Sequence, residues 1–366
     1  MYEFQTNKTD LSKCRLVETT KPEISQDQAL LKVDKFAFTA NNITYAAMGD
    51  ALRYWQFFPP SGDNPQDWGI IPVWGFADVV QSNSSELPVG DRLFGYFPPT
   101  NYLAITPSKV SAGALMDGSE HRRSLPPGYN LYRRVLAEAN YQPQADDERM
   151  LLFVLHLTSF CLYDMLQSND WFGAQQVVII SASSKTSTGL AYGLQADESA
   201  PAVVGLTSAR NLALVDSLSV YQSAYSYDDI EKIDASLATV IVDMSGDSSV
   251  LGRLHTHLGD NMRFCSNVGF THWNEPRSGE GIIQERSEMF FAPSVIQTRM
   301  KEWGREEFDK RSMQFVMHSA ARSRSWLKMT YLEGVTGLQE VYADVCDGKI
   351  AADQGLIVKM YNSLEL

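Results

Sequence analysis

The stretch Val177–Leu194, VVIISASSKTSTGLAYGL, indicates the kind of fold that this chain adopts. It opens with a continuous apolar run, passes through a polar turn and closes with the small residues of a packed helix. A continuous apolar run is expected for a strand in a sheet that helices cover on both faces. A strand, a short turn and a helix form the repeating unit of parallel α/β folds. The stretch therefore predicts an α/β architecture around it.

Similar apolar segments precede and follow the turn. The expected strands are QQVVIIS (175–181), PAVVGLTS (201–208), SAYSY (223–227), ATVIVDMS (238–245) and MRFCSNVGF (262–270). They alternate with segments whose sequence pattern is helical, as in a doubly wound parallel sheet. After the fifth strand, the polar segment 271–289 is predicted as a loop, and charged helical text occupies 293–324.

The first third of the chain has a different pattern. Its strand-like runs are short and are separated by glycine- and proline-rich segments, which indicates a partly closed β-barrel; the runs lie within Gln28–Asn42, Ile70–Ser82 and Leu87–Pro107. An apolar core helix, Met150–Leu166, follows Asp146 and Asp147, which suit an N-cap and a first turn. The last part, from Gly337, reads as helix, turn and strand.

Length and composition bound the class of protein. The 366 residues are enough for two domains, and we predict a β-rich domain of residues 1–150 together with 326–366 and a doubly wound domain of residues 151–325. The net charge of −13 argues against nucleic-acid binding, because neutralising phosphates needs a basic surface. The four cysteines form no C-x-x-C pair. No apolar signal segment opens the chain, and Met150–Leu166 is shorter than the about 20 residues of a membrane span. We therefore expect a cytoplasmic protein with no nucleic-acid or membrane partner.

The polar turn in the opening stretch could bind phosphate. In dinucleotide-binding folds, a glycine-containing turn joins the first strand to a helix whose N-terminus faces the pyrophosphate. Here Lys185 supplies a positive charge, Gly189 could allow close packing between helix and strand, and four hydroxyls could donate to phosphate oxygens: Ser183, Ser184, Thr186 and Thr188. The alternative is that these residues are helix caps and turn residues.

The ends of the following strands indicate which dinucleotide would bind. NAD-preferring proteins hold the ribose with an acid about 20 residues past the turn, but the second strand here ends without one. Ser208 and Arg210 stand there with Thr207, and a guanidinium with hydroxyls suits a 2′-phosphate, so we expect NADP. At the carboxyl ends of the fourth and fifth strands, the candidates for the nicotinamide ribose are Asp243, Ser245 and Asn267, which could also be ordinary turn residues.

Three segments carry a resemblance to a known superfamily. LPVGDRLFGY (Leu87–Tyr96), IIPVWGFADVVQS (Ile70–Ser82) and FAFTANNITYAAMGD (Phe36–Asp50) are similar to characteristic stretches of the medium-chain dehydrogenases/reductases. The order of a β-rich domain, a dinucleotide domain and a return strand is similar as well. The zinc-free quinone oxidoreductase-like branch is the most similar one. More narrowly, FTANNITYAAMGD, PVWGFADV, SASSKT and FFAP resemble an uncharacterised branch described as a domain of unknown function.

The resemblance implies a GroES-like, partly closed β-barrel domain plus a doubly wound Rossmann domain, with NADP as cofactor and a possible homodimer. It implies metal-free hydride transfer from NADPH to a small-molecule substrate of the quinone, enone or enoyl type. Asn42 matches the asparagine of the family's active-site loop, and Tyr45 lies close to its acid position and could donate a proton. Arg53 and Tyr54 could bind an anionic or aromatic substrate or could belong to a core patch. Phe291 is expected near the nicotinamide.

Other functions stay open. The chain could be a non-catalytic NADP-binding or scaffold protein that retains the reductase fold. A methyltransferase also uses a doubly wound sheet, but it would prefer an acid at the end of the second strand. A P-loop is suggested by Ser184-Lys185-Thr186, although its leading glycine would fall at Ile179. No zinc is expected, because neither Cys nor His occurs from Arg15 to Glu120.

Overall fold

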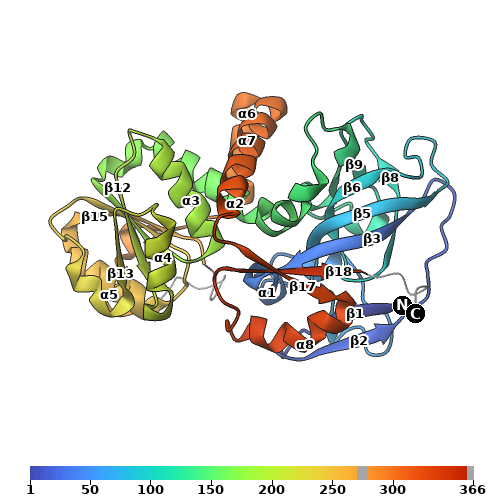
Figure 1. Ribbon diagram of the computed structural model, residues 1–366, viewed down its shortest axis with the longest axis horizontal. Helices are drawn as coiled ribbons and strands as arrows, with labels where there is room; N and C mark the ends of the chain where they lie inside the picture. Colours follow the sequence, from blue (N-terminus) through green and yellow to red (C-terminus); the bar gives the residue numbers. More distant parts are fainter. Residues whose placement is uncertain (270–278, 361–366) are drawn as a thin grey trace. The chain divides into compact units, whose positions relative to one another are not determined.

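The computed structural model describes residues 1–269 and 279–360, and the chain divides into two compact units (Figure 1). The first unit comprises Met1–Leu151 and the segment from Leu327 onward, and the second comprises Leu152–Trp326. The first consists mostly of strands, whereas strands and helices alternate in the second. The predicted α/β fold class is confirmed.

The second unit is built around a six-stranded sheet in which every pairing is parallel. Its strands are β11 (Gln176–Ile180), β12 (Ala202–Thr207), β13 (Ser223–Ser226), β14 (Thr239–Asp243), β15 (Met262–Asn267) and β16 (Ser287–Met289). Their order across the sheet is β13-β12-β11-β14-β15-β16. Successive strands from β11 to β13 are therefore added on one side of β11, and those from β14 to β16 are added on its other side, so that the strand order reverses between β11 and β14. Open α/β sheets bind ligands at the carboxyl ends of the strands that flank such a switch point.

Alternate residues of β11 face two separate hydrophobic cores. Val177 and Ile179 pack in one core with residues of α2, α3 and α7, whereas Val178 and Ile180 pack in the other with residues of α5. All four side chains are fully buried, which is why this strand is apolar without alternation. Helices thus cover both faces of the sheet (Figure 1); those of this unit are α2 (Asp146–Ser168, which starts in the first unit), α3 (Lys185–Ala196), α4 (Leu212–Leu218), α5 (Ser248–Leu258), α6 (Ala292–Trp303) and α7 (Arg305–Ser323).

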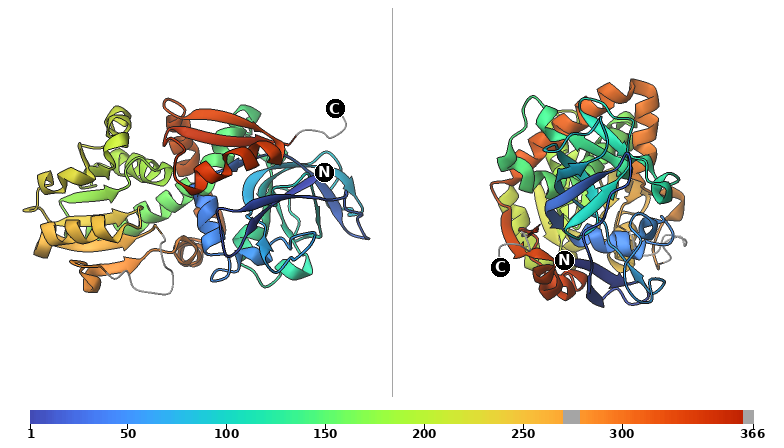
Figure 2. Two further views of the ribbon diagram at one scale, coloured as in Figure 1. Left: turned by 90° about the horizontal axis from the view of Figure 1, so that it is seen from below. Right: turned by 90° about the vertical axis from the view of Figure 1, so that its right-hand side faces the viewer.

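The first unit forms the GroES-like barrel. A nine-stranded sheet runs β17-β18-β3-β5-β6-β10-β9-β8 with β7 also paired to β3, and a smaller sheet runs β2-β1-β4. The return strands β17 and β18, red in Figure 2, pair in parallel, and β18 lies antiparallel to β3. The end of the chain therefore completes the sheet that its first third begins.

The strands and helices of the first unit have the following bounds: β1 (Tyr2–Asn7), β2 (Cys14–Glu18), β3 (Ala29–Phe38), α1 (Ala40–Ala47), β4 (Trp68–Gly69), β5 (Val73–Ser82), β6 (Arg92–Phe97), β7 (Tyr102–Ile105), β8 (Pro107–Ser108), β9 (Ala114–Asp117), β10 (Leu131–Arg134), β17 (Lys328–Glu333), α8 (Gly334–Cys346) and β18 (Gln354–Lys359).

The structure corrects three predicted boundaries. The strand expected over Gln28–Asn42 ends at Phe38, because Thr39 is the N-cap of α1 and accepts a hydrogen bond from the Asn41 N–H. Within the expected loop 271–289, residues 287–289 form β16, whereas residues 270–278 lie outside the described residues. The charged helix expected over 293–324 is divided by Gly304, whose φ of 82° a helix cannot contain.

Helix α2 has Asp146 and Asp147 in its first turn, close to where the sequence predicts its start, and it ends two residues after Leu166. It spans Asp146–Ser168, and Pro143–Ser168 is the one helical stretch among the described residues that is long and apolar enough to cross a membrane. In this stretch, 67% of the most apolar window is buried inside the protein. That degree of burial is typical of a core helix.

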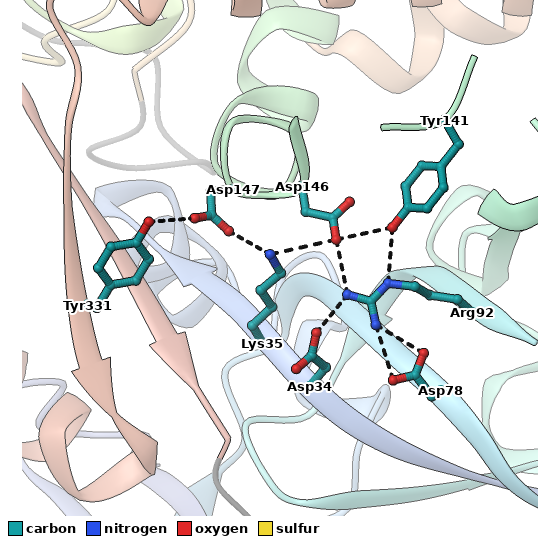
Figure 3. Close-up of polar contacts among 8 residues, drawn as sticks. All are labelled: Asp34, Lys35, Asp78, Arg92, Tyr141, Asp146, Asp147 and Tyr331. Atoms are coloured by element: carbon teal, nitrogen blue, oxygen red, sulfur yellow. Dashed lines mark hydrogen bonds and ion pairs between the residues drawn. The ribbon is translucent and has the colours of Figure 1, made fainter. Parts of the chain in front are cut away.

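A network of ion pairs and hydrogen bonds links the first turn of α2 to strands of the barrel (Figure 3). Arg92 on β6 reaches Asp34 at 2.6 Å, Asp78 at 3.0 Å and Asp146 at 3.0 Å. The Asp146 side chain is only 1% exposed, so its charge depends on Arg92 and on Lys35, whose Nζ lies 3.6 Å from the carboxylate. The remaining members of the network are Lys35, Tyr141, Asp147 and Tyr331.

Candidate functional site

The turn between β11 and α3 adopts a glycine-like conformation without a glycine. Ser181 directly follows β11 and has a φ of 63°, in the left-handed region that glycine usually occupies. The Ser184 N–H donates to the Ser181 carbonyl at 2.9 Å, and α3 begins at Lys185. The turn thus places the N-terminus of a helix at the carboxyl end of β11, a position that favours anions.

Ser183 has a hydroxyl suited to a phosphate oxygen. Its Oγ lies 3.1 Å from Asn211 Nδ2 and 3.3 Å from Thr207 Oγ1, and accepts hydrogen bonds from both. Because an amide N–H can only donate, the proton of Ser183 stays available for an acceptor such as phosphate. Asn211 ends the short helix η7 (Ala209–Asn211). Sequence alone does not single out Asn211, because its contact depends on β12 lying beside β11.

Two of the predicted phosphate ligands have internal roles instead. Ser184 is the N-cap of α3; it accepts from the Ser187 N–H at 3.1 Å and donates to Ser187 Oγ at 2.8 Å. Thr188 is fully buried and donates to the Ser184 carbonyl at 3.0 Å. Capping, the alternative interpretation, therefore describes these two residues. Lys185 and Thr186 open α3 and are partly exposed.

Gly189 allows close packing, but its partner is a helix rather than a strand. A Cβ at this position would lie 2.6 Å from Ser159 Oγ and 2.7 Å from His156 Cδ2, both on α2. The P-loop alternative is wrong, because Ile179, where its leading glycine would stand, is fully buried inside β11.

The end of β12 carries a cation and no carboxylate. Ser208 directly follows the strand and is half-buried, and Arg210 is exposed within η7. Residues 202–211 contain neither Asp nor Glu. This composition suits a phosphate on the ribose better than a free 2′-hydroxyl.

The residues expected near the nicotinamide ribose shape the turn after β14. Asp243 is fully buried, and its Oδ1 accepts from the Ser245 N–H at 2.8 Å, the Ser245 hydroxyl at 2.7 Å and the Gly246 N–H at 3.3 Å. Asn267 ends β15 in register with Asp243. Phe291 is the N-cap residue of α6. Asp243 and Ser245 therefore define the backbone at the switch point.

The first unit contains an aromatic group that we call the phenol cluster: Tyr45 of α1, Tyr54 of η1 (Tyr54–Gln56), Trp74 of β5, Tyr96 of β6 and Tyr129 of η3 (Pro127–Asn130). The ring centroids of Tyr45 and Tyr54 are 4.8 Å apart, as are those of Tyr96 and Tyr129. Tyr129 is half-buried and the others are buried. Burial raises the pKa of each tyrosine, so all four phenols are protonated at neutral pH.

The hydrogen bonds of the phenol cluster leave protons available. Trp74 Nε1 donates to the Tyr45 hydroxyl at 3.2 Å, and since an indole N–H can only donate, Tyr45 keeps its own proton for another acceptor. The hydroxyls of Tyr54 and Tyr129 lie 2.9 Å apart and share one hydrogen bond. Within the described residues, the buried Tyr96 hydroxyl has no hydrogen-bond partner. The phenols of Tyr45 and Tyr96 thus have protons to donate, and both side chains are buried.

Two other predicted catalytic residues do not belong to this donor set. The Nδ2 of buried Asn42 donates to the Pro72 carbonyl at 2.9 Å, and its Oδ1 accepts from the Thr39 N–H at 2.8 Å. Asn42 thus fixes the start of α1. Arg53 is exposed and donates to Gln56 Oε1 at 2.9 Å. Tyr45 and Tyr54 are brought together, whereas Asn42 and Arg53 are engaged elsewhere.

The two neighbouring histidines of α5 contact backbone groups. His255 Nδ1 accepts from the Ile283 N–H, and His257 Nε2 lies 2.8 Å from the Ile233 carbonyl. In residues 1–269 and 279–360, no group of three or more His, Cys, Asp or Glu side chains could hold a metal ion.

The barrel with its return strands and the doubly wound unit together define a medium-chain dehydrogenase/reductase fold. Within that class, the family described as "Protein of unknown function (DUF2855)" matches residues 36–351, and the chain belongs to this family. A comparison with curated protein sequences found no match.

Solved structures with a similar fold include three proteins that are about one-tenth identical to this chain. CurA from Vibrio vulnificus in complex with NADPH is 11% identical, with a TM-score of 0.64 over 99% of this chain and 100% of that chain. The quinone oxidoreductase from Thermus thermophilus is 12% identical, with a TM-score of 0.57 over 98% and 100%. A mutant form of the enoyl thioester reductase from Candida tropicalis is 10% identical, with a TM-score of 0.55 over 98% and 100%. At these identities the likeness shows the fold.

Proposed function

We propose that this protein is an NADPH-dependent, metal-free reductase of a quinone, enone or enoyl-type substrate. The observation that carries the proposal is the turn at the switch point, where the Ser183 proton is available and Lys185 opens α3. Arg210, with no acid nearby in sequence, follows β12. This set of donors fits the pyrophosphate and 2′-phosphate of NADP. NADPH complexes of proteins with the same fold support the assignment.

In this proposal, the second unit holds the cofactor. Lys185 and Ser183 bind the pyrophosphate, and Arg210 and Ser208 bind the 2′-phosphate. When bound, NADPH supplies a hydride to an electrophilic carbon of the substrate. Asp243 keeps the turn after β14 in place, because its carboxylate binds three donors of that turn.

The phenol cluster of the first unit supplies the proton in the proposal. Tyr45 donates its phenol proton to the substrate oxygen or to the carbon atom next to the reduced one. The phenolate that forms keeps the hydrogen bond from Trp74 Nε1, which stabilises its negative charge. Tyr96 adds a second donor for the substrate oxygen. The aromatic rings of the cluster favour a planar substrate.

A non-catalytic NADP-binding protein is the second candidate. The observation that favours it is the burial of Tyr45, which is 4% exposed and packs against Tyr54, Tyr96 and Tyr129. Such a protein would bind NADPH as tightly as a reductase and would transfer no hydride.

Two measurements on the full chain test the proposal. Titration of fluorescent NADPH should show saturable binding; a titration without saturation would overturn both candidate functions. Oxidation of bound NADPH should then be followed at its absorbance maximum with a panel of quinones, enones and enoyl thioesters. Turnover of at least one class supports the reductase, whereas saturable binding without any turnover supports the non-catalytic protein.

A further inference from the structure

The phosphate turn contains a residue in a backbone conformation that it does not favour. Ser181 has a φ of 63°. In this region the Cβ of a non-glycine residue lies too close to the following carbonyl oxygen. Such a conformation persists where the surrounding structure holds it, and it is common at functional sites. The question is which side chains hold this one.

Tyr221 reaches the turn from the segment before β13. Its hydroxyl donates to the carbonyl of Ala182, the residue after Ser181, at 2.8 Å. Gly205 on β12 makes room for this contact: a Cβ there would lie 3.1 Å from the Tyr221 ring and 3.1 Å from the Ala182 Cβ. Burial raises the pKa of Tyr221, which keeps the donating proton in place.

We infer that Tyr221 is a positioning residue for the phosphate turn. Its hydrogen bond to the Ala182 carbonyl holds Ser181 in the left-handed region and thereby sets the position of Ser183. Asn211 donates to the Ser183 oxygen, which leaves the Ser183 proton for a phosphate oxygen that would bind there. The inference rests on the proposed function for the identity of the ligand, the pyrophosphate of a dinucleotide. The hydrogen bond from Tyr221 to the Ala182 carbonyl, which we call the tyrosine brace, thus has the role that the conformational freedom of glycine has in other dinucleotide turns.

The test is a double-mutant cycle on the full chain, with NADPH and NADH as probes. Tyr221→Phe removes only the hydroxyl, and we expect about a fivefold higher Kd, the effect of one lost hydrogen bond. NADPH and NADH should lose affinity by the same factor, because both contain the pyrophosphate. Ser181→Gly should restore the affinity of Tyr221→Phe to within about twofold of the native value, since glycine adopts a positive φ without a brace.

The matched control is Tyr163→Phe, which removes a hydroxyl bonded to Asp197 in the same unit. Its NADPH affinity should stay native, and Ser181→Gly should not change the melting temperature of this variant more than that of the native protein. Unchanged affinity in Tyr221→Phe, or a loss that Ser181→Gly does not restore, would overturn the inference. Circular dichroism and thermal melting establish that each variant is folded.

The two proposals fail in different ways. If the native protein binds neither NADPH nor NADH, the proposed function is wrong, but the brace can still be measured without a ligand. Ser181→Gly should then recover the melting temperature lost in Tyr221→Phe and not that lost in Tyr163→Phe. Equal recovery in both, or in neither, would reject the brace.

Discussion

Gly189 of α3 lies directly against the imidazole of His156 on α2. A Cβ on Gly189 would approach His156 Cδ2 to 2.7 Å and Ser159 Oγ to 2.6 Å. Neither neighbour can move easily, because His156 Nδ1 is 2.7 Å from Ser319 Oγ and Ser159 donates to the Thr186 carbonyl at 2.7 Å. The contact sets the position of the helix that begins at the phosphate turn.

Gly189→Ala should therefore destabilise the protein and weaken cofactor binding. We expect a loss of about 1–3 kcal/mol in the free energy of unfolding, typical of overpacking in a rigid core. Urea unfolding measures the loss. Gly113→Ala is the control, because a Cβ there meets no atom within 4 Å. Equal stability of the two variants would show that α2 and α3 can separate at no cost.

His156 should make stability depend on pH. Burial lowers its pKa to about 3, whereas the unfolded chain has an ordinary histidine pKa of about 6.5. Between these values only the unfolded chain binds the proton, so the free energy of unfolding should fall as the pH falls below about 6.5. The contribution of one group is at most about 1.4 kcal/mol per pH unit. His255, whose pKa burial lowers to about 4, acts in the same direction.

Urea unfolding over a series of pH values checks this dependence. His156→Asn should flatten the profile, because the amide keeps a polar partner for Ser319 and does not titrate. A variant with the native slope would assign the pH dependence to other groups.

Substitutions of Arg210 and Lys185 should affect the binding of NADPH and NADH differently, because the two residues are assigned to different phosphates. Arg210→Ala should raise the Kd for NADPH about 10-fold or more and leave that for NADH nearly unchanged, because only NADPH carries the 2′-phosphate. Lys185→Ala should weaken both, because they share the pyrophosphate. Arg263→Ala is the matched control: this exposed arginine lies near the beginning of β15, at the opposite end of the strands. Equal losses of NADPH and NADH in Arg210→Ala would contradict the assignment.

Tyr45→Phe should separate binding from chemistry. The Kd for NADPH should stay native, whereas kcat should fall about 100-fold or more, as expected when a general acid is removed. Turnover is measured with whichever substrate class the native enzyme reduces. Tyr342→Phe is the control, since the Tyr342 hydroxyl donates a hydrogen bond to the Leu11 carbonyl in the same unit. A native kcat in Tyr45→Phe would remove Tyr45 from the proposed mechanism.

Arg92→Met should be among the more destabilising substitutions in the barrel. It leaves buried Asp146 with the more distant Lys35, at 3.6 Å, in place of Arg92 at 3.0 Å, and breaking a buried pair costs about 3–5 kcal/mol. Asp78→Asn should cost less than about 1 kcal/mol, because the Asp78 side chain is 44% exposed and solvent screens its pair with Arg92. Urea unfolding of the two variants compares these values, and a similar loss in both would contradict the dominant role of Asp146.

Much of the fold can be predicted from sequence because its cause is local. Val177–Ile180 is apolar at every position, and that property alone indicates a strand covered on both faces. The strands β11, β12, β14 and β15 follow from such runs, whereas β13 is short and partly exposed. The strand β16 could not be predicted in this way, because Ser287 and Glu288 are polar and pair with β15 at an edge of the sheet. The start of helix α1 was predicted as part of a strand, because its sequence continues the strand-like pattern of β3. The Thr39 cap marks the point where β3 ends and α1 begins.

The residue types of the candidate site can be predicted from the local sequence as well. They are hydroxyls and a lysine after β11, and an arginine without an acid after β12. Which hydroxyl is available is a different matter, since hydrogen bonds decide it. Ser184 and Thr188 use their protons within α3, whereas Ser183 receives a bond from Asn211, 28 positions further along the chain. Tyr96 and Tyr129 join Tyr45 because β6 and η3 come together in the barrel. Periodicity and composition are properties of neighbouring residues and identify the elements; donor–acceptor pairing joins distant residues, and it exists once the chain has folded.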